Sequence, residues 1–340
     1  MGEKSPLLKV VNLKKTYPIR GGIVTHTVGQ VRAVNGISFS IDRGTTLGLV
    51  GESGCGKSTV GRQIVALEKP TAGEIWFDSR EISRFTEKQM RPLRTDLQMV
   101  FQDSYSSLNP RKRVVDILAQ PMRYHKLIAR GETEKEVNRL LEMVGLPKSS
   151  KERFPYEFSG GQRQRICIAK ALSLRPKLLV CDEPVSALDV SVQAQILNLL
   201  RDLQKELGLT CLFIGHGLGA VHYVSDRIAV MYLGRLMEVA DADALFHHPA
   251  HPYTQALCAA VPNPDPDDRA PAVLLQGEAA TDTANARRDT GCPFAGRCSY
   301  AKEACRQVKA DLQPVTAGST HLTACPFVRA ESTEEVQANG

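Results

Sequence analysis

The pattern of apolar and polar positions predicts alternating strands and helices over most of the chain. Apolar runs at 46–51, 177–184 and 210–215 predict strands that are buried on both faces of a sheet. Apolar residues also recur every three or four positions, as over 196–207, and this spacing predicts helices that bury one face. The stretch 227–239 is divided by a glycine and predicts two strands joined by a turn. The expected fold class is therefore α/β with added antiparallel strands.

Charge and proline content divide the chain in two. Residues 1–262 carry a net charge of +9, whereas residues 263–340 carry −3. Four prolines among acidic residues, in PNPDPDDRAP at 262–271, predict a linker, because proline interrupts helices and central strands. We expect one large domain at 1–262, a linker and a small cysteine-rich domain at 263–330, and a disordered tail at 331–340.

The overall composition excludes several classes of protein. Of the 340 residues, 42% are hydrophobic and 24% are charged, which is typical of a globular protein and not of a disordered chain. Because there is no apolar run of about 18 residues and no apolar leader, we expect a cytosolic protein without a membrane span. The net charge of +6 argues for neither nucleic acid nor membrane contact.

A phosphate-binding loop is predicted between the first buried strand and the helical run that follows it. Residues 51–59 read GESGCGKST and match G-x-x-x-x-G-K-[ST] in the strand–loop–helix context that this pattern requires. Glycines let backbone N–H groups face phosphate oxygens, the lysine reaches the terminal phosphates, and the next hydroxyl binds Mg²⁺. The residues expected to bind ATP are Gly51, Ser53, Gly54, Gly56, Lys57, Ser58 and Thr59.

Two carboxylates end the second buried strand. In LLVCDE, Asp182 is placed to hold Mg²⁺ through its water shell, and Glu183 is placed to polarise the attacking water. An ordinary solvated strand end would explain such a pair alone. Its combination with a phosphate loop favours a nucleoside triphosphatase.

The motif SGGQ carries a resemblance to the ATPases of ABC transporters. A serine and two glycines at the start of a helix form an anion-binding N-terminus, and this motif lies between the phosphate loop and the acidic pair. The resemblance implies that it faces the γ-phosphate bound to the opposite subunit of a head-to-tail dimer. It also implies a P-loop NTPase fold with an antiparallel β subdomain and a helical subdomain at about 92–171. The residues of the motif are Ser159, Gly160, Gly161 and Gln162.

Two further ATP-binding positions follow from the resemblance. Tyr17 matches the aromatic residue that stacks on adenine, and stacking requires only a π-face. The stretch 19–32 between it and the first apolar strand is expected to be a long loop. Asp189 ends the segment SALD, which matches the family's motif at the dimer seam.

Two more positions are implied to act on the γ-phosphate. Gln102, in VFQD, matches the glutamine that senses Mg²⁺ and γ-phosphate, and so joins Ser58 and Asp182 as an implied Mg²⁺ ligand. His216, in FIGH, matches the histidine that touches γ-phosphate. It is followed by Gly217, where related importers usually carry an acidic residue, so this stretch is expected to be more mobile than usual and the positioning of the histidine is open.

Three segments narrow the resemblance to oligopeptide/dipeptide importers. The first, FQDSYSSLNPR at 101–111, resembles the extended glutamine loop of those proteins. The second, HPAHPYTQALCAAVPNPDP at 248–266, resembles the segment that closes their ATPase domain. The third is a group of four cysteines beyond the linker, which includes the two cysteines of GCPFAGRC.

The four C-terminal cysteines are spaced C-x5-C-x6-C-x19-C and are Cys292, Cys298, Cys305 and Cys325. Exposed thiols oxidise readily, and a segment of about 60 residues has a thin core, so a metal staple is expected. Four thiolates suit Zn²⁺ or an iron–sulfur cluster, and the spacing lacks the C-x2-C pairs of common zinc ribbons. The resemblance implies a 4Fe-4S cluster, with Zn²⁺ or unligated thiols as open alternatives.

The resemblance implies an ATP-hydrolysing subunit that powers import of peptides or related small solutes at the cytoplasmic face of the inner membrane. Implied partners are a second ATPase subunit, two transmembrane permease subunits and an external substrate-binding protein, without nucleic acid. Two alternatives stay open: a soluble ABC ATPase acting on DNA or ribosomes, and a regulatory subunit with little hydrolysis. The stretch 59–160 has no sustained heptads of the kind found in DNA-repair relatives, and both Glu183 and His216 are present for hydrolysis.

Overall fold

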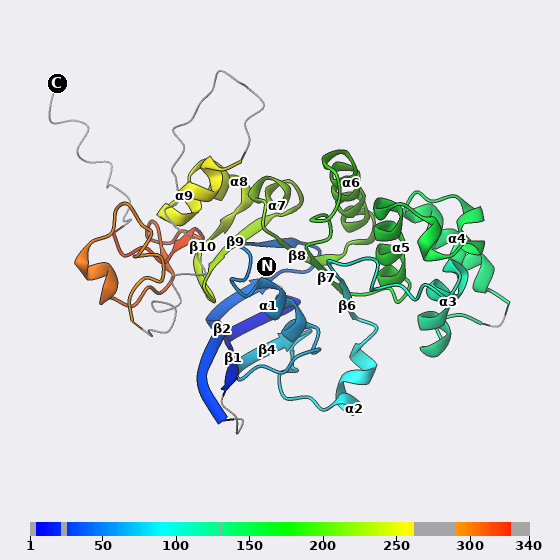
Figure 1. The fold of residues 1–340 in the computed structure, drawn as a ribbon, viewed down its shortest axis with the longest axis horizontal. Coiled ribbons are helices and arrows are strands. Elements are labelled where there is room, and N and C mark those ends of the chain that lie inside the picture. The colour runs from blue at the N-terminus through cyan, green and yellow to red at the C-terminus, as the bar shows by residue number, and fades with distance from the viewer. Residues whose placement is uncertain (1–4, 22–25, 130, 262–289, 328–340) are drawn as a thin grey trace, which may run out of the picture.

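Two sheets and a lobe of helices make up the protein (Figure 1). The computed structural model describes residues 5–21, 26–129, 131–261 and 290–327. The linker expected at 262–271 and the tail expected at 331–340 lie outside these residues.

A four-stranded antiparallel sheet in the order β2-β1-β4-β5 forms the expected β subdomain. Its strands are β1 (Leu8–Gly21), β2 (His26–Ile41), β4 (Ala72–Phe77) and β5 (Arg80–Glu81). The prediction of a long loop at 19–32 is wrong, because β1 and β2 stay paired there, with Ile19 opposite Gly29 and Thr16 opposite Arg32. The two strands satisfy each other's backbone groups although most described residues there are exposed or half-buried, so the apolar pattern gives no strand signal.

An eight-stranded mixed sheet carries the predicted nucleotide site, in the order β11-β12-β10-β9-β3-β8-β7-β6. Its strands are β3 (Thr46–Val50), β6 (Leu97–Val100), β7 (Leu178–Asp182), β8 (Thr210–Gly215), β9 (Arg227–Tyr232), β10 (Arg235–Asp241), β11 (Gln313–Pro314) and β12 (Leu322–Thr323). The run from β9 to β6 is parallel, whereas β10, β11 and β12 pair antiparallel. The three expected buried strands are confirmed as β3, β7 and β8, which are buried at every position.

Helices pack on both faces of this sheet, because alternate strand residues point to opposite faces. On β3, Leu49 joins the core under α1, and Val50 joins the core under α6 and α7. The helices near the sheet are α1 (Lys57–Ile64), α6 (Val190–Leu207), α7 (Leu218–Val224), α8 (Ala242–His247) and α9 (Pro252–Ala259). Figure 1 shows a separate helical lobe beyond β6, formed by α3 (Val114–Tyr124), α4 (Thr133–Met143) and α5 (Gly160–Leu172), while the short α2 (Glu87–Met90) precedes β6.

The close packing of α7 on the sheet depends on Gly48 in the middle of β3. A Cβ atom at this position would lie 2.3 Å from Val221 Cγ1 and 2.5 Å from Ser225 Oγ. We expect Gly48→Ala to lower the free energy of unfolding by about 1–3 kcal/mol, because the added methyl group overpacks the core. Equilibrium denaturation in urea measures this change.

The matched control for this substitution is Gly29→Ala in β2. A Cβ atom there would meet Ile19 Cδ1 at 3.5 Å, which is ordinary contact, so the free energy of unfolding should change by less than about 0.5 kcal/mol. Equal unfolding midpoints for the two variants would contradict this account of the packing.

Candidate nucleotide site

The loop between β3 and α1 turns at a glycine where any side chain would clash with the backbone of a neighbouring strand. Gly56 has φ +109°, and a Cβ atom on it would lie 2.0 Å from the backbone oxygen of Ala33. The loop therefore turns tightly at the carboxyl end of β3, and α1 begins directly after it at Lys57. The start of α1 offers backbone N–H groups and a partial positive charge, which favour a phosphate group.

Lys57 is held within the curve of this loop. Its side chain is 3% exposed, and Nζ donates hydrogen bonds to the carbonyl oxygens of Gly51, at 2.7 Å, and Glu52, at 3.0 Å. The same Nζ lies 3.9 Å from Glu183 Oε1. The loop thus places a buried positive charge beside the carboxylate that ends β7.

Glu183 is the meeting point of residues that are far apart in the sequence. Gln102 Nε2 donates a hydrogen bond to Glu183 Oε2 at 3.3 Å, and His216 Nδ1 lies 3.4 Å from that same oxygen. Lys57 lies beside the other carboxylate oxygen. Lys57, Gln102 and His216, all predicted site residues, therefore surround Glu183. Although Gly217 follows His216, the histidine faces Glu183, so in this structure the glycine does not turn the ring away from the site.

The backbone at Glu183 is in an uncommon conformation that directs this side chain. Its φ is +46°, which costs about 1–2 kcal/mol for a residue other than glycine. The backbone N–H of Glu183 donates to the carbonyl oxygen of Ile214 on β8 at 2.9 Å, and this bond holds the conformation. Strain of this kind persists where the surrounding structure fixes it, most often at functional sites.

Asp182 and Ser58 lie together beneath the loop. Ser58 Oγ donates a hydrogen bond to Asp182 Oδ1 at 2.8 Å, and Asp182 is 3% exposed. Burial raises the pKa of the Asp182 carboxyl, and the hydrogen bond from Ser58 partly opposes this rise. A hydroxyl and a carboxylate oxygen in contact are the donor types that Mg²⁺ prefers, so these two residues fit the expected metal site.

Tyr17 lies beside α1, although it belongs to β1. Its hydroxyl hydrogen-bonds to Glu68 and interacts with Thr59 at the start of α1, while the residue is 37% exposed. Burial, followed by the contact with Glu68, raises the pKa of the Tyr17 hydroxyl. Lys15 Nζ lies over the Tyr17 ring, 5.1 Å from its centroid, in a cation–π contact. The aromatic ring therefore lies near the start of α1.

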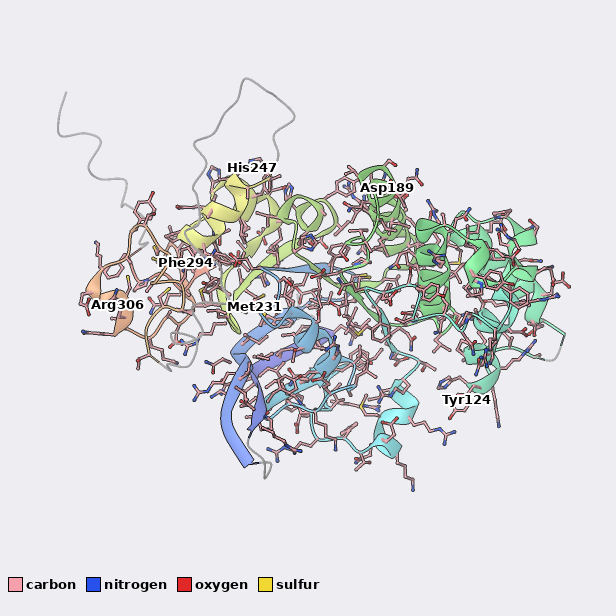
Figure 2. All side chains as sticks on the ribbon, in the orientation of Figure 1. Tyr124, Asp189, Met231, His247, Phe294 and Arg306 are labelled. Atoms are coloured by element: carbon pink, nitrogen blue, oxygen red, sulfur yellow. The ribbon has the colours of Figure 1, made fainter. Side chains whose placement is uncertain are left out.

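The SGGQ motif and Asp189 each form a helix cap. Ser159 is the N-cap of α5, where Gln162 N donates to Ser159 Oγ at 3.3 Å and Ser159 N donates to Gln162 Oε1 at 3.1 Å. Asp189 is the N-cap of α6 and accepts from Val192 N at 3.0 Å. Figure 2 shows Asp189 at the outer end of α6. The cap of α5 lies in the helical lobe, and β6 and β7 separate that lobe from β8 and β3.

Sequence reasoning did not single out Tyr253 as part of the site. Glu52 N, in the phosphate loop, donates a hydrogen bond to Tyr253 Oη at 3.0 Å. Burial raises the pKa of this hydroxyl far above its usual value, so it stays protonated and neutral. The HPYT segment that contains it carries a family resemblance, but nothing in its pattern indicates a contact 201 residues away.

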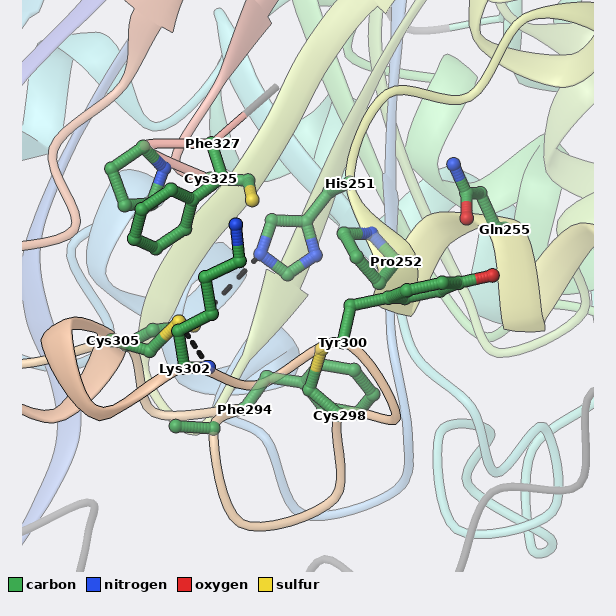
Figure 3. A pocket seen from close by; sticks show the side chains of 13 residues that line it. His251, Pro252, Gln255, Phe294, Cys298, Tyr300, Lys302, Cys305, Cys325 and Phe327 are labelled. Atoms are coloured by element: carbon green, nitrogen blue, oxygen red, sulfur yellow. Dashed lines mark hydrogen bonds between the residues drawn. The ribbon is translucent and has the colours of Figure 1, made fainter.

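The four C-terminal cysteines line one cavity of about 350 Å³ (Figure 3). His251 and Phe294 share this cavity, and Cys292 Sγ lies 3.9 Å from His251 Nε2. Burial raises the pKa of the Cys292 thiol to about 12 and lowers the pKa of His251 to about 4. His321 lies four residues before Cys325, and its Nε2 contacts Glu238 Oε1 at 2.6 Å. Within the described ranges, no three His, Cys, Asp or Glu side chains are grouped closely enough to hold a single metal ion.

Comparison with known proteins places this geometry in a family. The family model "ABC transporter" matches residues 34–186, and the model "Oligopeptide/dipeptide transporter, C-terminal region" matches residues 237–305. The oligopeptide transport ATP-binding protein AppF of Bacillus subtilis is 46% identical over 322 residues, which are 94% of this chain and 96% of that protein. The chain belongs to the ABC transporter family, in the oligopeptide/dipeptide branch of its ATP-binding subunits.

Further relatives agree in sequence and in fold. The dipeptide transport ATP-binding protein DppF of Escherichia coli is 43% identical over 91% of this chain and 92% of its own length. A dimeric, post-hydrolysis structure of the ATP-binding cassette MJ0796 bound to ADP and Pi has a TM-score of 0.61 and 26% identity, over 69% of this chain and 98% of that one. CbiO1 from Clostridium perfringens, part of the transporter complex cbiONQ, has a TM-score of 0.62 and 29% identity, over 72% and 91%.

The ABC ATPase fold expected from the sequence is thereby confirmed. This ATP-binding subunit is an ATPase whose activity is coupled to transport. In the part of the chain that the structure describes, no helix combines the length and the apolar character needed to cross a membrane.

The convergence on Glu183 predicts the effect of removing its charge. We expect Glu183→Gln to bind ATP as the unaltered chain does and to lower the turnover rate by about 10²–10⁴-fold, because an amide takes up no proton from water. Single-turnover hydrolysis, measured beside nucleotide binding, separates the two effects. Unchanged hydrolysis in this variant would refute the role given to Glu183.

Proposed function

We propose that this subunit hydrolyses ATP to power the import of peptides, or of related small solutes, across the cytoplasmic membrane. The observation that carries the proposal is the convergence of Gln102, His216 and Lys57 on Glu183. In this arrangement Glu183 accepts a proton from the attacking water, and Lys57 and His216 stabilise the charge on the γ-phosphate. Mg²⁺, held by Ser58, Asp182 and Gln102, would neutralise phosphate charge when it is bound.

The proposed working unit is a pair of ATPase subunits arranged head to tail. The N-cap at Ser159 is the start of a 13-residue helix and lies apart from the phosphate loop of its own chain. A helix start of this kind suits a phosphate group, and in a pair it would face the nucleotide held by the other subunit. Asp189 caps the start of α6, and the next residue, Val190, is 81% exposed. This exposed helix start fits the seam between the subunits. The solved relative MJ0796 is itself described as a dimer.

The glutamine loop is the proposed route from the nucleotide to the membrane partner. Lys170 Nζ of α5 donates to the carbonyl oxygen of Ser107 at 3.0 Å, which ties the loop to the helical lobe. In the same loop Tyr105 is 62% exposed and Phe101 is 39% exposed. Exposed aromatic side chains on a loop that is anchored at the site suit a permease surface, which supports the proposed position at the cytoplasmic face of the membrane.

Transport in proteoliposomes tests the proposed function. The chain is co-purified with its permease subunits, reconstituted, and supplied with the external binding protein and labelled dipeptides or oligopeptides. We expect ATP-dependent uptake that stops with Glu183→Gln. A pull-down that recovers ribosomes or DNA, and no membrane protein, would favour the alternative of a soluble ABC ATPase.

We also propose that the cysteine cavity holds a 4Fe-4S cluster on Cys292, Cys298, Cys305 and Cys325. Four thiols lining one cavity supply the full ligand set of such a cluster. The spacing C-x5-C-x6-C-x19-C lacks the C-x2-C pairs of common zinc ribbons, which favours the cluster over Zn²⁺. The thiols would release their protons on binding iron.

Anaerobic purification tests the cluster. We expect brown protein with a broad absorbance near about 400 nm, and about four iron and four sulfide per chain. Cys305 is 7% exposed, and Cys305→Ser should remove most of this absorbance. Colourless protein with one zinc per chain would instead establish the alternative metal.

A further inference from the structure

An ion pair joins the C-terminal segment, here residues 290–327, to the phosphate loop. Arg297 Nη1 lies 2.9 Å from Glu52 Oε1 and 3.0 Å from Glu52 Oε2, and it also donates to Tyr232 Oη at 3.3 Å. The side chain of Arg297 is 8% exposed and that of Glu52 is 24% exposed. A pair shielded from solvent to this extent interacts more strongly than a surface pair.

A second contact holds the same loop residue from its backbone side. Tyr253 Oη accepts the hydrogen bond from Glu52 N, as described above. Its ring packs against Tyr232 and Phe294, with centroids at 4.8 Å and 5.3 Å. Phe294 is 2% exposed and lies three residues before Arg297. The aromatic group therefore fixes the segment from which Arg297 reaches the loop.

The C-terminal segment is itself anchored to the central sheet. Leu322 and Thr323 pair with Val239 and Glu238 on β10, and Ala324 N donates to the carbonyl oxygen of Met237 at 2.8 Å. The carboxylate of Glu238 is fully buried and accepts from the backbone N–H groups of Ala250 and His251 at 2.8 and 2.7 Å. Arg297 thus reaches Glu52 from a segment that the sheet holds in place.

We propose that Arg297 is a positioning residue of the nucleotide site and acts through Glu52. It holds the Glu52 side chain and neutralises its charge at the start of the loop that receives the triphosphate. Without Arg297, the Glu52 carboxylate would lose this ion pair, and its negative charge on the phosphate loop would repel the bound phosphates. The inference rests on the ATP-binding part of the proposed function.

ATP affinity, measured by isothermal titration with Glu183→Gln as the common background, tests the inference. Arg297→Ala should weaken binding about tenfold, the effect expected for one unpaired charge within roughly 10 Å of the phosphates. Glu52→Gln alone should bind ATP as tightly as the background or more tightly. The double variant Arg297→Ala with Glu52→Gln should return to within about twofold of the background, because the repelling charge is gone.

The control is Arg306→Ala, in the same C-terminal segment. Arg306 forms an exposed pair with Glu303 at 3.9 Å, and Figure 2 places it at the outer edge of the segment, whereas Phe294 lies on the inner side. We expect no change in ATP affinity for this variant. If Arg297→Ala and Arg306→Ala bind ATP equally well, the inference is wrong.

The double variant separates charge coupling from mere docking of the segment. If Arg297→Ala weakens binding and Glu52→Gln does not restore it, Arg297 serves only to hold the segment, and the inference is overturned. Should Arg297→Ala fail to fold, Arg297→Lys keeps the charge and is expected to bind ATP within about threefold of the background; a tenfold loss there would count against the inference. Binding by the background chain tests the proposed function, and the differences among variants test this inference.

Discussion

The parallel register of β3, β8 and β7 is the constraint on which the site depends. Val50 lies opposite Gly215, and Asp182 lies opposite Ile214, so the carboxyl ends of the three strands meet at one edge of the sheet. The phosphate loop, His216 and the acidic pair each follow directly from one of these ends. A change of register by one residue would point the buried side chains to the opposite face and separate the groups around Glu183.

Local features then refine what the strands bring together. Gly56 allows the loop to pass next to the backbone of Ala33, and the positive φ of Glu183 directs its carboxylate toward Lys57, Gln102 and His216. The ion pair with Arg297 adds a contact from the C-terminal segment to the same loop. The nucleotide site is therefore shared by the sheet, the glutamine loop and a segment far along the chain.

Much of this arrangement can be predicted from the sequence because its signals are local. The phosphate loop is a short motif between a strand and a helix, and Asp182 and Glu183 end an uninterrupted apolar strand. The hairpin of β1 and β2 could not be predicted, because backbone pairing between exposed strands leaves no apolar pattern. The contacts of Glu52 with Tyr253 and Arg297 could not be predicted either, because they span 201 and 245 residues and depend on tertiary packing.

In the proposed dimer, one edge of the sheet holds the triphosphate, and the cap at Ser159 of a second subunit closes over it. Vanadate trapped with MgADP occupies the γ-phosphate position, and illumination then cleaves the backbone next to the bound oxyanion. Mass spectrometry of the fragments locates the cuts. The account predicts cleavage within residues 51–59 and next to Ser159. Cleavage confined to other parts of the chain would contradict it.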